Sequence, residues 1–215
     1  MADLAHPAAP HRRPHHPRTP DTDSPTTDLL LNATGQFLRD QGAIGRAITY
    51  LDRALTASQR LYGPGHPDTL ISRNNLAGAY QAAGDLERAI PLHEQTLADR
   101  KRVLGADHPH TLQSRNNLAA AYETAGDLER AIPLHEQTLT DYERVLGADH
   151  PSTLQSRNNL AGAYYAAGDL GRAIPLHEQT LTDRERVLGA DHPTTRIVRK
   201  NLAIARDASP GPGTG

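Results

Sequence analysis

The feature that most constrains this sequence is a repeat of fixed length. The segment SRNNLAGAYQAAGDLERAIPLHEQTL, from Ser72 to Leu97, recurs twice almost unchanged and once more in a degraded form. A constant period of this length is typical of solenoids, in which each repeat packs only against its neighbours. The arginine of this segment marks the spacing of 42 residues, since it recurs at Arg73, Arg115, Arg157 and Arg199.

Composition indicates which secondary structure can build such repeats. The 215 residues include one Phe, no Trp and seven Tyr, so the buried surface must come mostly from Leu, Ala, Ile and Val. Small aliphatic residues suit closely packed helices and argue against a β-sandwich, whose strands favour aromatic and β-branched residues. The length is sufficient for one domain with a core of its own.

The charge pattern argues against polyanionic partners. The 23 basic and 25 acidic residues are interleaved, and the net charge is −2. No extended positive surface is therefore expected to attract nucleic acid or anionic lipid, and we predict neither a nucleic-acid nor a membrane partner. The absence of cysteine excludes a disulfide framework, a thiolate nucleophile and a cysteine-based zinc site.

The two ends of the sequence differ from the repeats. Residues 1–27 contain six prolines and four histidines, and residues 208–215 are rich in Gly and Pro, so we predict disordered segments at both ends. The first segment lacks the apolar core of a secretion signal, and no run reaches the roughly 18 to 20 apolar residues of a membrane span. These features predict a cytoplasmic protein. Because only Lys101 and Lys200 are lysine among the basic residues, a GC-rich and bacterial coding sequence is indicated.

Each 42-residue unit divides into two helical patterns. Apolar residues keep helical spacing from about Thr69 to Ala83, where Gly84 ends the first helix. Asp85 is a good N-cap for a second helix, which continues until Gly105. The unit is therefore predicted to be a helical hairpin. A proline falls inside each second helix, where we expect a mild kink instead of a break, at Pro91, Pro133 and Pro175.

These patterns divide the chain into repeats. A diverged first repeat is predicted because Gly42 matches Gly84 and GPGHPDTL matches GADHPHTL without a gap. The last helix is rich in charge, as expected of a terminal cap that faces water. The predicted boundaries are 28–68 for repeat 1, 69–110 for repeat 2, 111–152 for repeat 3, 153–193 for repeat 4 and 194–207 for the capping helix.

From about residue 28 to residue 207 the sequence resembles the tetratricopeptide repeat family. The 42-residue period with NNLA, AIPLHEQTL and VLGADHP is similar to the kinesin light chain subtype. The resemblance implies an all-α, right-handed superhelical solenoid of antiparallel helix hairpins, with a concave groove lined by the first helix of each repeat. The sequence departs from the family pattern at the arginine of each repeat and at His93, His135 and His177.

The resemblance nominates the paired asparagines as peptide-binding residues of this groove. An Asn amide both donates and accepts, so it can bind the backbone of an extended peptide of any sequence. Small residues at Gly78, Ala120 and Gly162 would leave room for the ligand backbone. The alternative is that one Asn of each pair bonds to the neighbouring repeat. The nominated residues are Asn75, Asn117, Asn159 and Asn201, then Asn74, Asn116 and Asn158, with Gln81, Glu123 and Tyr165 setting preference.

The arginine column has two interpretations. Arg73, Arg115 and Arg157 could reach the groove or could form structural ion pairs between helices. We favour the structural pair, because an unpaired charge beside the packed face would be costly. The expected partners are Glu94, Glu136 and Glu178.

No catalytic residue, metal site or cofactor site is predicted. HEQTL is similar to the start of a zinc-protease signature, but Leu97 stands where the second histidine ligand would be. A structural, partly buried His93 is expected instead. One histidine in each connector is expected to fix that connector by hydrogen bonding, and the four histidines near the N-terminus lack the preorganisation of a metal site. The connector histidines are His66, His108, His150 and His192.

The function predicted from these features is a non-enzymatic adaptor or scaffold. Its groove would bind an extended or helical segment of a protein partner, and the chain itself would be a monomer with at most weak self-association. One alternative is a structural protein that assembles end to end. Another is a regulatory module that acts in trans on a signalling ATPase, by analogy with bacterial chains in which such repeats are fused to ATPase domains.

Overall fold

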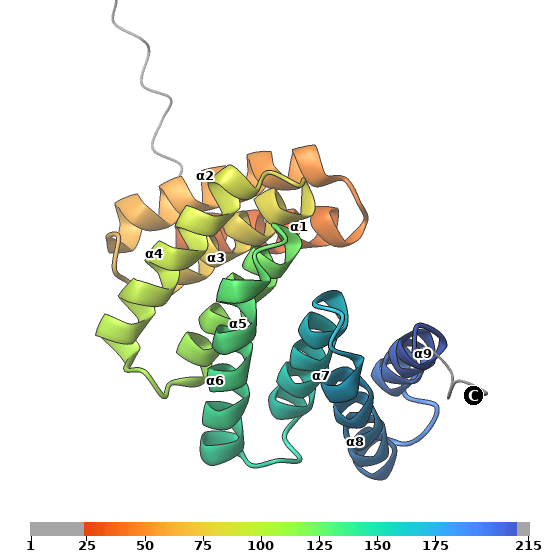
Figure 1. The fold of residues 1–215 in the computed structure, drawn as a ribbon. Helices are drawn as coiled ribbons and strands as arrows, with labels where there is room; N and C mark the ends of the chain where they lie inside the picture. Colours follow the sequence, from red (N-terminus) through yellow and green to blue (C-terminus); the bar gives the residue numbers. More distant parts are fainter. Residues whose placement is uncertain (1–23, 210–215) are drawn as a thin grey trace, which may run out of the picture.

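The computed structural model describes residues 24–209, and within this range it consists of helices and connectors without a β-strand (Figure 1). Four helical hairpins are followed by a single helix, as the 42-residue period predicts. The helices are α1 Pro25–Asp40, α2 Ile44–Tyr62, α3 Pro67–Ala82, α4 Leu86–Leu104, α5 Pro109–Thr124, α6 Leu128–Leu146, α7 Pro151–Ala166, α8 Leu170–Leu188 and α9 Pro193–Asp207.

Helix boundaries follow from short sequence signals. From α3 onwards each odd-numbered helix begins with a proline, whose missing N–H costs little in the first turn. The preceding histidine caps the helix, which is a more specific role than the predicted hydrogen bonding within the connector: His150 Nδ1 accepts a hydrogen bond from the Ser152 amide at 3.1 Å. In the hairpins, Gly84 has φ of 76°, a conformation that glycine adopts without steric cost, and Asp85 then caps α4.

The prolines inside the second helices do not end them. Pro91 lies within α4, and the corresponding prolines lie within α6 and α8. Pro91 is exposed, so the carbonyl group that loses its helical partner is close to water. The prediction that these helices continue past the proline is confirmed.

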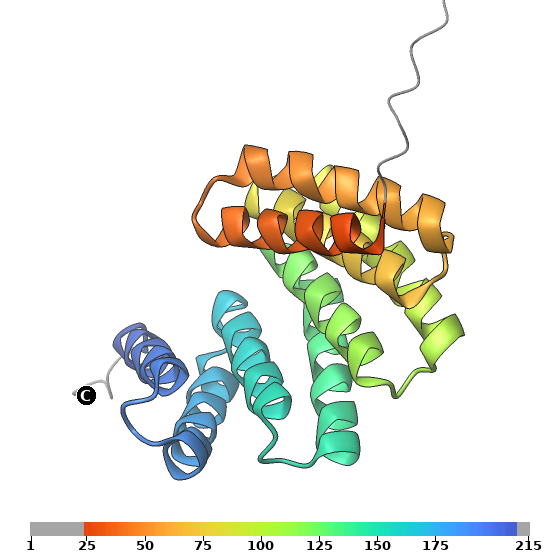
Figure 2. The same ribbon diagram turned by 180° about the vertical axis from the view of Figure 1, so that it is seen from behind.

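The helices form two layers. Each helix packs against the next one in the chain, and the odd-numbered helices also approach each other from repeat to repeat, whereas in the described range the even-numbered helices have no Cα atoms within 8 Å of one another and meet only through side chains. The odd-numbered helices therefore form an inner layer and the even-numbered helices an outer one. Figure 2 shows the odd-numbered helices following one another along the solenoid, with α1 at its edge.

Alanine and leucine build the core, as the composition predicts. Ala47, Ala89, Ala131 and Ala173 occupy one position of the second helix in each repeat, and all are fully buried. An alanine at a contact point allows two helices to approach closely, and leucines from neighbouring helices fill the space around it. Separate apolar clusters recur along the chain, each joining one repeat to the next.

The ends of the solenoid lie close to the predicted boundaries. Helix α1 begins at Pro25 and is capped by Ser24, three residues before the predicted start at Asp28. Helix α9 exposes Arg196 and Arg206 on the side that a further helix would cover, which agrees with a terminal cap. The predicted disordered segments fall mainly on residues 1–23 and 210–215, which lie outside the described residues.

Candidate functional site

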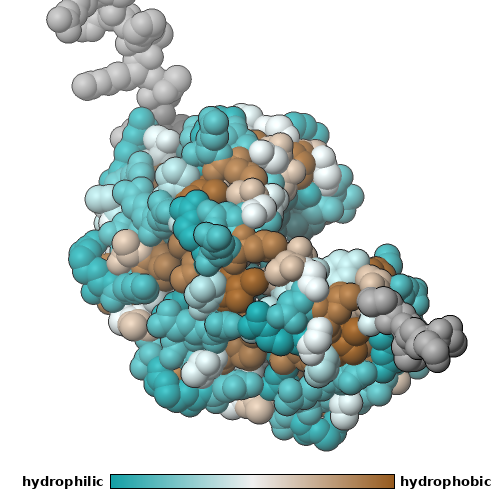
Figure 3. All heavy atoms as spheres, viewed as in Figure 1, coloured by the Kyte–Doolittle hydropathy of each residue, from teal (hydrophilic) through white to brown (hydrophobic). Residues whose placement is uncertain are grey.

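A first hollow lies on the inner side of the early repeats. Its walls come from α1, α3 and α5, and one side chain of α4 contributes to its floor. In the view of Figure 3 the molecule is hollowed between its upper part and the region of α7 and α9. The residues that line the first hollow are Arg39, Asn74, Gly78, Gln81, Ala82, His93, Asn117 and Thr124.

A second hollow continues this surface between α5 and α7. It shares Asn117 with the first, so we call the two together the inner groove. Four predicted site residues therefore line one continuous surface: Asn74, Asn116, Asn117 and Gln81. The residues that line the second hollow are Pro109, His110, Gln113, Asn116, Asn117, Tyr142, Pro151, Ser152 and Gln155.

The paired asparagines join the repeats to one another. The second Asn of each pair donates from Nδ2 to Oδ1 of the first Asn in the preceding repeat, as between Asn117 and Asn74 at 3.0 Å. The first repeat takes part through Asn32, and the capping helix through Asn201. We call this row the asparagine ladder. Its other bonds are Asn75 to Asn32 at 3.2 Å, Asn159 to Asn116 at 3.3 Å and Asn201 to Asn158 at 3.3 Å.

The ladder leaves hydrogen-bonding capacity on its exposed edge. Each amide group has two N–H donors and an oxygen with two lone pairs, and one ladder bond uses only a part of these. Asn74, Asn116, Asn117 and Asn159 are partly exposed, whereas Asn75 is largely buried. The alternative that one Asn of each pair bonds to the neighbouring repeat is therefore present in the structure. Both members of a pair take part, one as donor and the other as acceptor.

One repeat position beside the ladder carries a different residue in each repeat: Gln81, Glu123 and Tyr165. Gln81 Nε2 donates to Thr124 Oγ1 of the next repeat at 3.2 Å, and Tyr165 is 37% exposed. Glu123 Oε2 lies 3.5 Å from Nε2 of the buried His135. These three side chains differ in charge and size at one position of the repeat, so they give each part of the groove a different chemistry.

The space above the small residues is narrower than the sequence suggests. A Cβ atom added to Gly78 would lie 3.3 Å from Nη1 of Arg39, and one added to Gly162 would lie 3.9 Å from Oε1 of Glu123. The side chain of the preceding repeat therefore occupies part of the room that these glycines provide. A ligand backbone that approaches Gly78 has to displace the Arg39 guanidinium.

Comparison with known proteins assigns the family. Two family models described as tetratricopeptide repeat match the sequence, one over residues 26–102 and 73–144 and the other over residues 153–194. The chain is a tetratricopeptide repeat protein. A search of curated proteins finds no significant match. Tetratricopeptide repeats generally serve as protein–protein interaction modules and are typically non-catalytic.

Solved structures refine the assignment to a subtype. A Podosopora anserina chain described as a kinesin light chain with nearly identical TPR-like repeats is 30% identical, with a TM-score of 0.72 over 87% of this chain and 89% of that chain. A variant of it gives the same identity and TM-score, over 86% and 88%. BtubC (BKLC) from P. vanneervenii shares the fold at 21% identity, with a TM-score of 0.71 over 85% and 74%. The tetratricopeptide repeats of this chain are therefore kinesin light chain-like.

The arginine column of this tetratricopeptide repeat protein forms ion pairs inside each hairpin. Arg115 Nη1 lies 2.6 Å from Asp141 Oδ2, and the arginine is 3% exposed. The same pair recurs as Arg73 with Asp99 at 2.7 Å and as Arg157 with Asp183 at 2.6 Å. The hydrogen bond from Arg73 lowers the pKa of Asp99, which keeps the pair charged. The structural interpretation is confirmed.

The predicted partners of these arginines were wrong. The aspartates lie five residues beyond the predicted glutamates, and so on a different part of the second helix. The glutamates bond to the next repeat instead: Glu94 accepts from the Tyr122 hydroxyl at 2.5 Å and Glu136 from Tyr164 at 2.6 Å. Glu178 accepts from Arg206 of the capping helix at 2.7 Å.

The histidines of the second helices are buried below the inner groove. His93 and His135 have no hydrogen-bond partner for either ring nitrogen in the described residues. Burial, with a smaller contribution from the charge of Arg100, lowers the pKa of His93 to about 4. Burial also lowers the pKa of His177. His93 is 1% exposed and is therefore more deeply buried than the sequence predicted. No group of His, Asp and Glu in residues 24–209 is arranged to hold a metal ion.

One variable repeat position that reaches the inner groove through a single residue was not nominated from the sequence. Arg100, Tyr142 and Arg184 share a repeat position, and Tyr142 lines the second hollow. Arg100 Nη1 donates to the His110 carbonyl at 2.8 Å, and Arg184 Nη2 donates to Gln155 Oε1 at 2.9 Å. The sequence did contain a signal for this position, because Tyr142 and Arg184 are among the few differences between repeats 3 and 4, which are otherwise almost identical.

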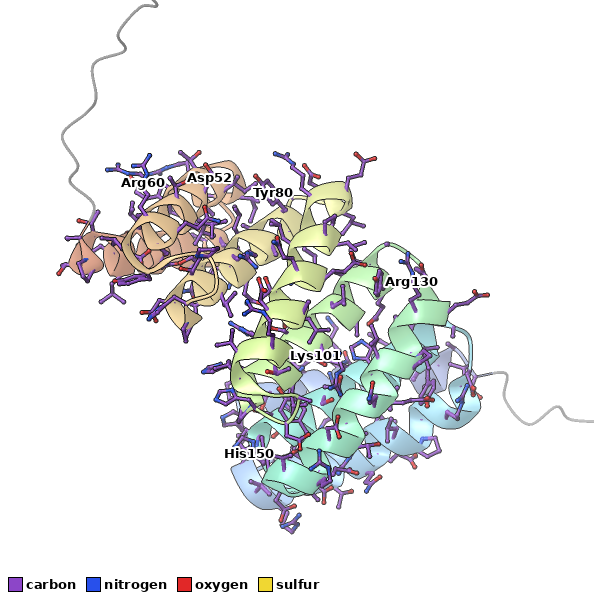
Figure 4. The ribbon with its side chains drawn as sticks, turned by 90° about the vertical axis from the view of Figure 1, so that its left-hand side faces the viewer. Asp52, Arg60, Tyr80, Lys101, Arg130 and His150 are labelled. Atoms are coloured by element: carbon purple, nitrogen blue, oxygen red, sulfur yellow. The ribbon has the colours of Figure 1, made fainter. Side chains whose placement is uncertain are left out.

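The outer helices present a different surface. Lys101 and Arg130 border a shallow apolar depression between α4 and α6, and Figure 4 shows both on this side of the molecule. The Arg130 guanidinium stacks on the Tyr122 ring at 4.1 Å and pairs with Asp127. These polar groups already bond to each other, so this surface offers less free hydrogen-bonding capacity than the groove. No helix in the described range is long and apolar enough to cross a membrane.

Proposed function

We propose that this tetratricopeptide repeat protein is a non-enzymatic adaptor whose inner groove binds an extended segment of another protein. The asparagine ladder is the observation that carries the proposal. It places partly exposed amide groups at regular intervals along the inner layer, and such groups pair with a peptide backbone independently of its sequence. The proposed site of action is the cytoplasm.

Side chains around the ladder differ from repeat to repeat, and we expect them to determine which peptide sequences the groove prefers. Gln81, Glu123 and Tyr165 present an amide, a carboxylate and a phenol in successive repeats. Arg100 and Arg184 are each 3% exposed and have no carboxylate within ion-pair distance among the described residues. Both guanidinium groups donate to protein acceptors and line neither hollow, so the preference is assigned to the column of Gln81, Glu123 and Tyr165.

A peptide-display selection on the folded chain tests the proposal. The groove variant carries Gln81→Ala, Glu123→Ala and Tyr165→Ala, and the matched control carries Gln95→Ala, Gln137→Ala and Gln179→Ala. The control residues are exposed on the outer helices at one repeat position. These sets avoid the ladder, so that loss of stability does not imitate loss of binding.

The proposal predicts that selected peptides bind the parent and the control equally and bind the groove variant at least tenfold more weakly. This corresponds to about 1.4 kcal/mol or more of binding free energy. Equal binding to all three proteins, or no enrichment by the parent, would contradict a role for the groove.

A further inference from the structure

Helix α1 exposes an apolar stripe, and later repeats bury the positions of its two large residues. Leu30 is 60% exposed and Phe37, the single phenylalanine of the chain, is 62% exposed. At the same repeat positions, α3 has Ser72 and Ala79, and both are fully buried against the preceding repeat. The first repeat therefore carries larger and more apolar residues where it has no preceding repeat to contact.

The stripe has the spacing of a coiled-coil seam. Thr26, Leu30, Ala33 and Phe37 follow one another at intervals of four, three and four residues, and all four are exposed. None of them is charged. Such an a/d pattern favours packing against a second helix at a small crossing angle.

The opposite end of the solenoid does not complement this stripe. Helix α9 presents Arg196 at 64% exposure and Arg206 at 59% where a further helix would pack. Packing of the α1 stripe on that end would bring guanidinium groups against Leu30 and Phe37 at a desolvation cost. The 23 residues that precede Ser24 contain five prolines, which is not the sequence of a repeat helix.

We propose that the α1 stripe pairs with the same stripe of a second copy of this chain. The two helices lie antiparallel around a two-fold axis at Ala33, whose small side chain permits close approach. Leu30 then packs against the partner's Phe37, and the reverse contact follows by symmetry, as a self-complementary interface requires.

The proposed dimer is small and therefore weak. A helix of 16 residues is about 24 Å long, and one such helix on each side buries less than the roughly 800 Å² per partner of a stable interface. We expect a dissociation constant in the micromolar range.

Sedimentation equilibrium of the full chain tests this proposal. The double variant Leu30→Ser, Phe37→Ala gives α1 the residues that later repeats have at these positions, so the helix is retained. The matched control, Ile197→Gln with Ile204→Ala, makes the corresponding exchange on α9. The parent and the control should dimerise alike, and the double variant should dimerise at least tenfold more weakly. A parent that stays monomeric to several hundred micromolar, or a double variant that dimerises like the parent, would overturn the proposal.

A cross-linking experiment tests the two-fold geometry. The chain has no cysteine, so Ala33→Cys introduces a single thiol at the proposed axis, and Ala203→Cys introduces one on α9 as a control. Under mild oxidation Ala33→Cys should form a disulfide-linked dimer, and Ala203→Cys should remain largely monomeric. Equal cross-linking of the two variants, or none with Ala33→Cys, would contradict antiparallel pairing of α1.

Discussion

At the scale of single residues, the repeats are held together by polar groups that are unusually deep in the packing. Buried Arg115 and His135 sit a few residues from fully buried alanines, and the arginine is neutralised by Asp141. Such positions make the fold sensitive to pH and to substitution, because a charge or donor left without a partner is costly. The histidines provide the clearest measurable consequence.

Acidification should destabilise the fold through His93. Its folded-state pKa of about 4 lies below the usual value of 6.5, so the unfolded chain binds the extra proton between these pH values. The associated stability is present above pH 6.5 and is lost as pH falls toward 4. We expect a loss of about 2 kcal/mol between pH 7.5 and pH 5 from this residue alone.

Urea unfolding of the parent and of His93→Leu at these two pH values measures this contribution. The variant should lose less stability on acidification by about that amount, while the contributions of all other groups are common to both proteins. Identical pH dependence of the two proteins would show that His93 is not kept neutral by burial.

At the scale of helices, α3, α5, α7 and α9 each begin at a histidine cap. His150→Ala removes the acceptor for the Ser152 amide and should lower the free energy of unfolding by about 1 kcal/mol. His150→Asn keeps an acceptor at the N-cap and should retain most of the stability. Thermal and urea unfolding of the two variants provide the measurement, and equal losses would mean that the capping bond contributes little.

Helix positions and helix partners were not equally predictable. The caps, glycines and apolar period placed the first clear hairpin within about two residues, because these signals act within one turn. The partner of Arg73 was missed because the second helix offers two acidic residues, Glu94 and Asp99, and only the rotation of α4 against α3 distinguishes them. The room above Gly78 was overestimated because Arg39 comes from a different repeat.

At the scale of the whole molecule, the solenoid combines a uniform stack with two unlike ends. The ladder continues from Asn32 in α1 to Asn201 in α9, so each repeat is joined to the next in the same way. The repeat period and the asparagine face could be predicted from the sequence. The direction of the ladder bonds could not, because it depends on how one repeat is rotated against the next.

The most direct test of the account is amide hydrogen exchange of the chain with and without a selected peptide. Binding in the inner groove predicts added protection in α3, α5 and α7, with little change in α4, α6 and α8 on their outer side. Protection concentrated in the outer helices, or confined to α1 and α9, would contradict the claim that the asparagine-lined groove is the binding surface.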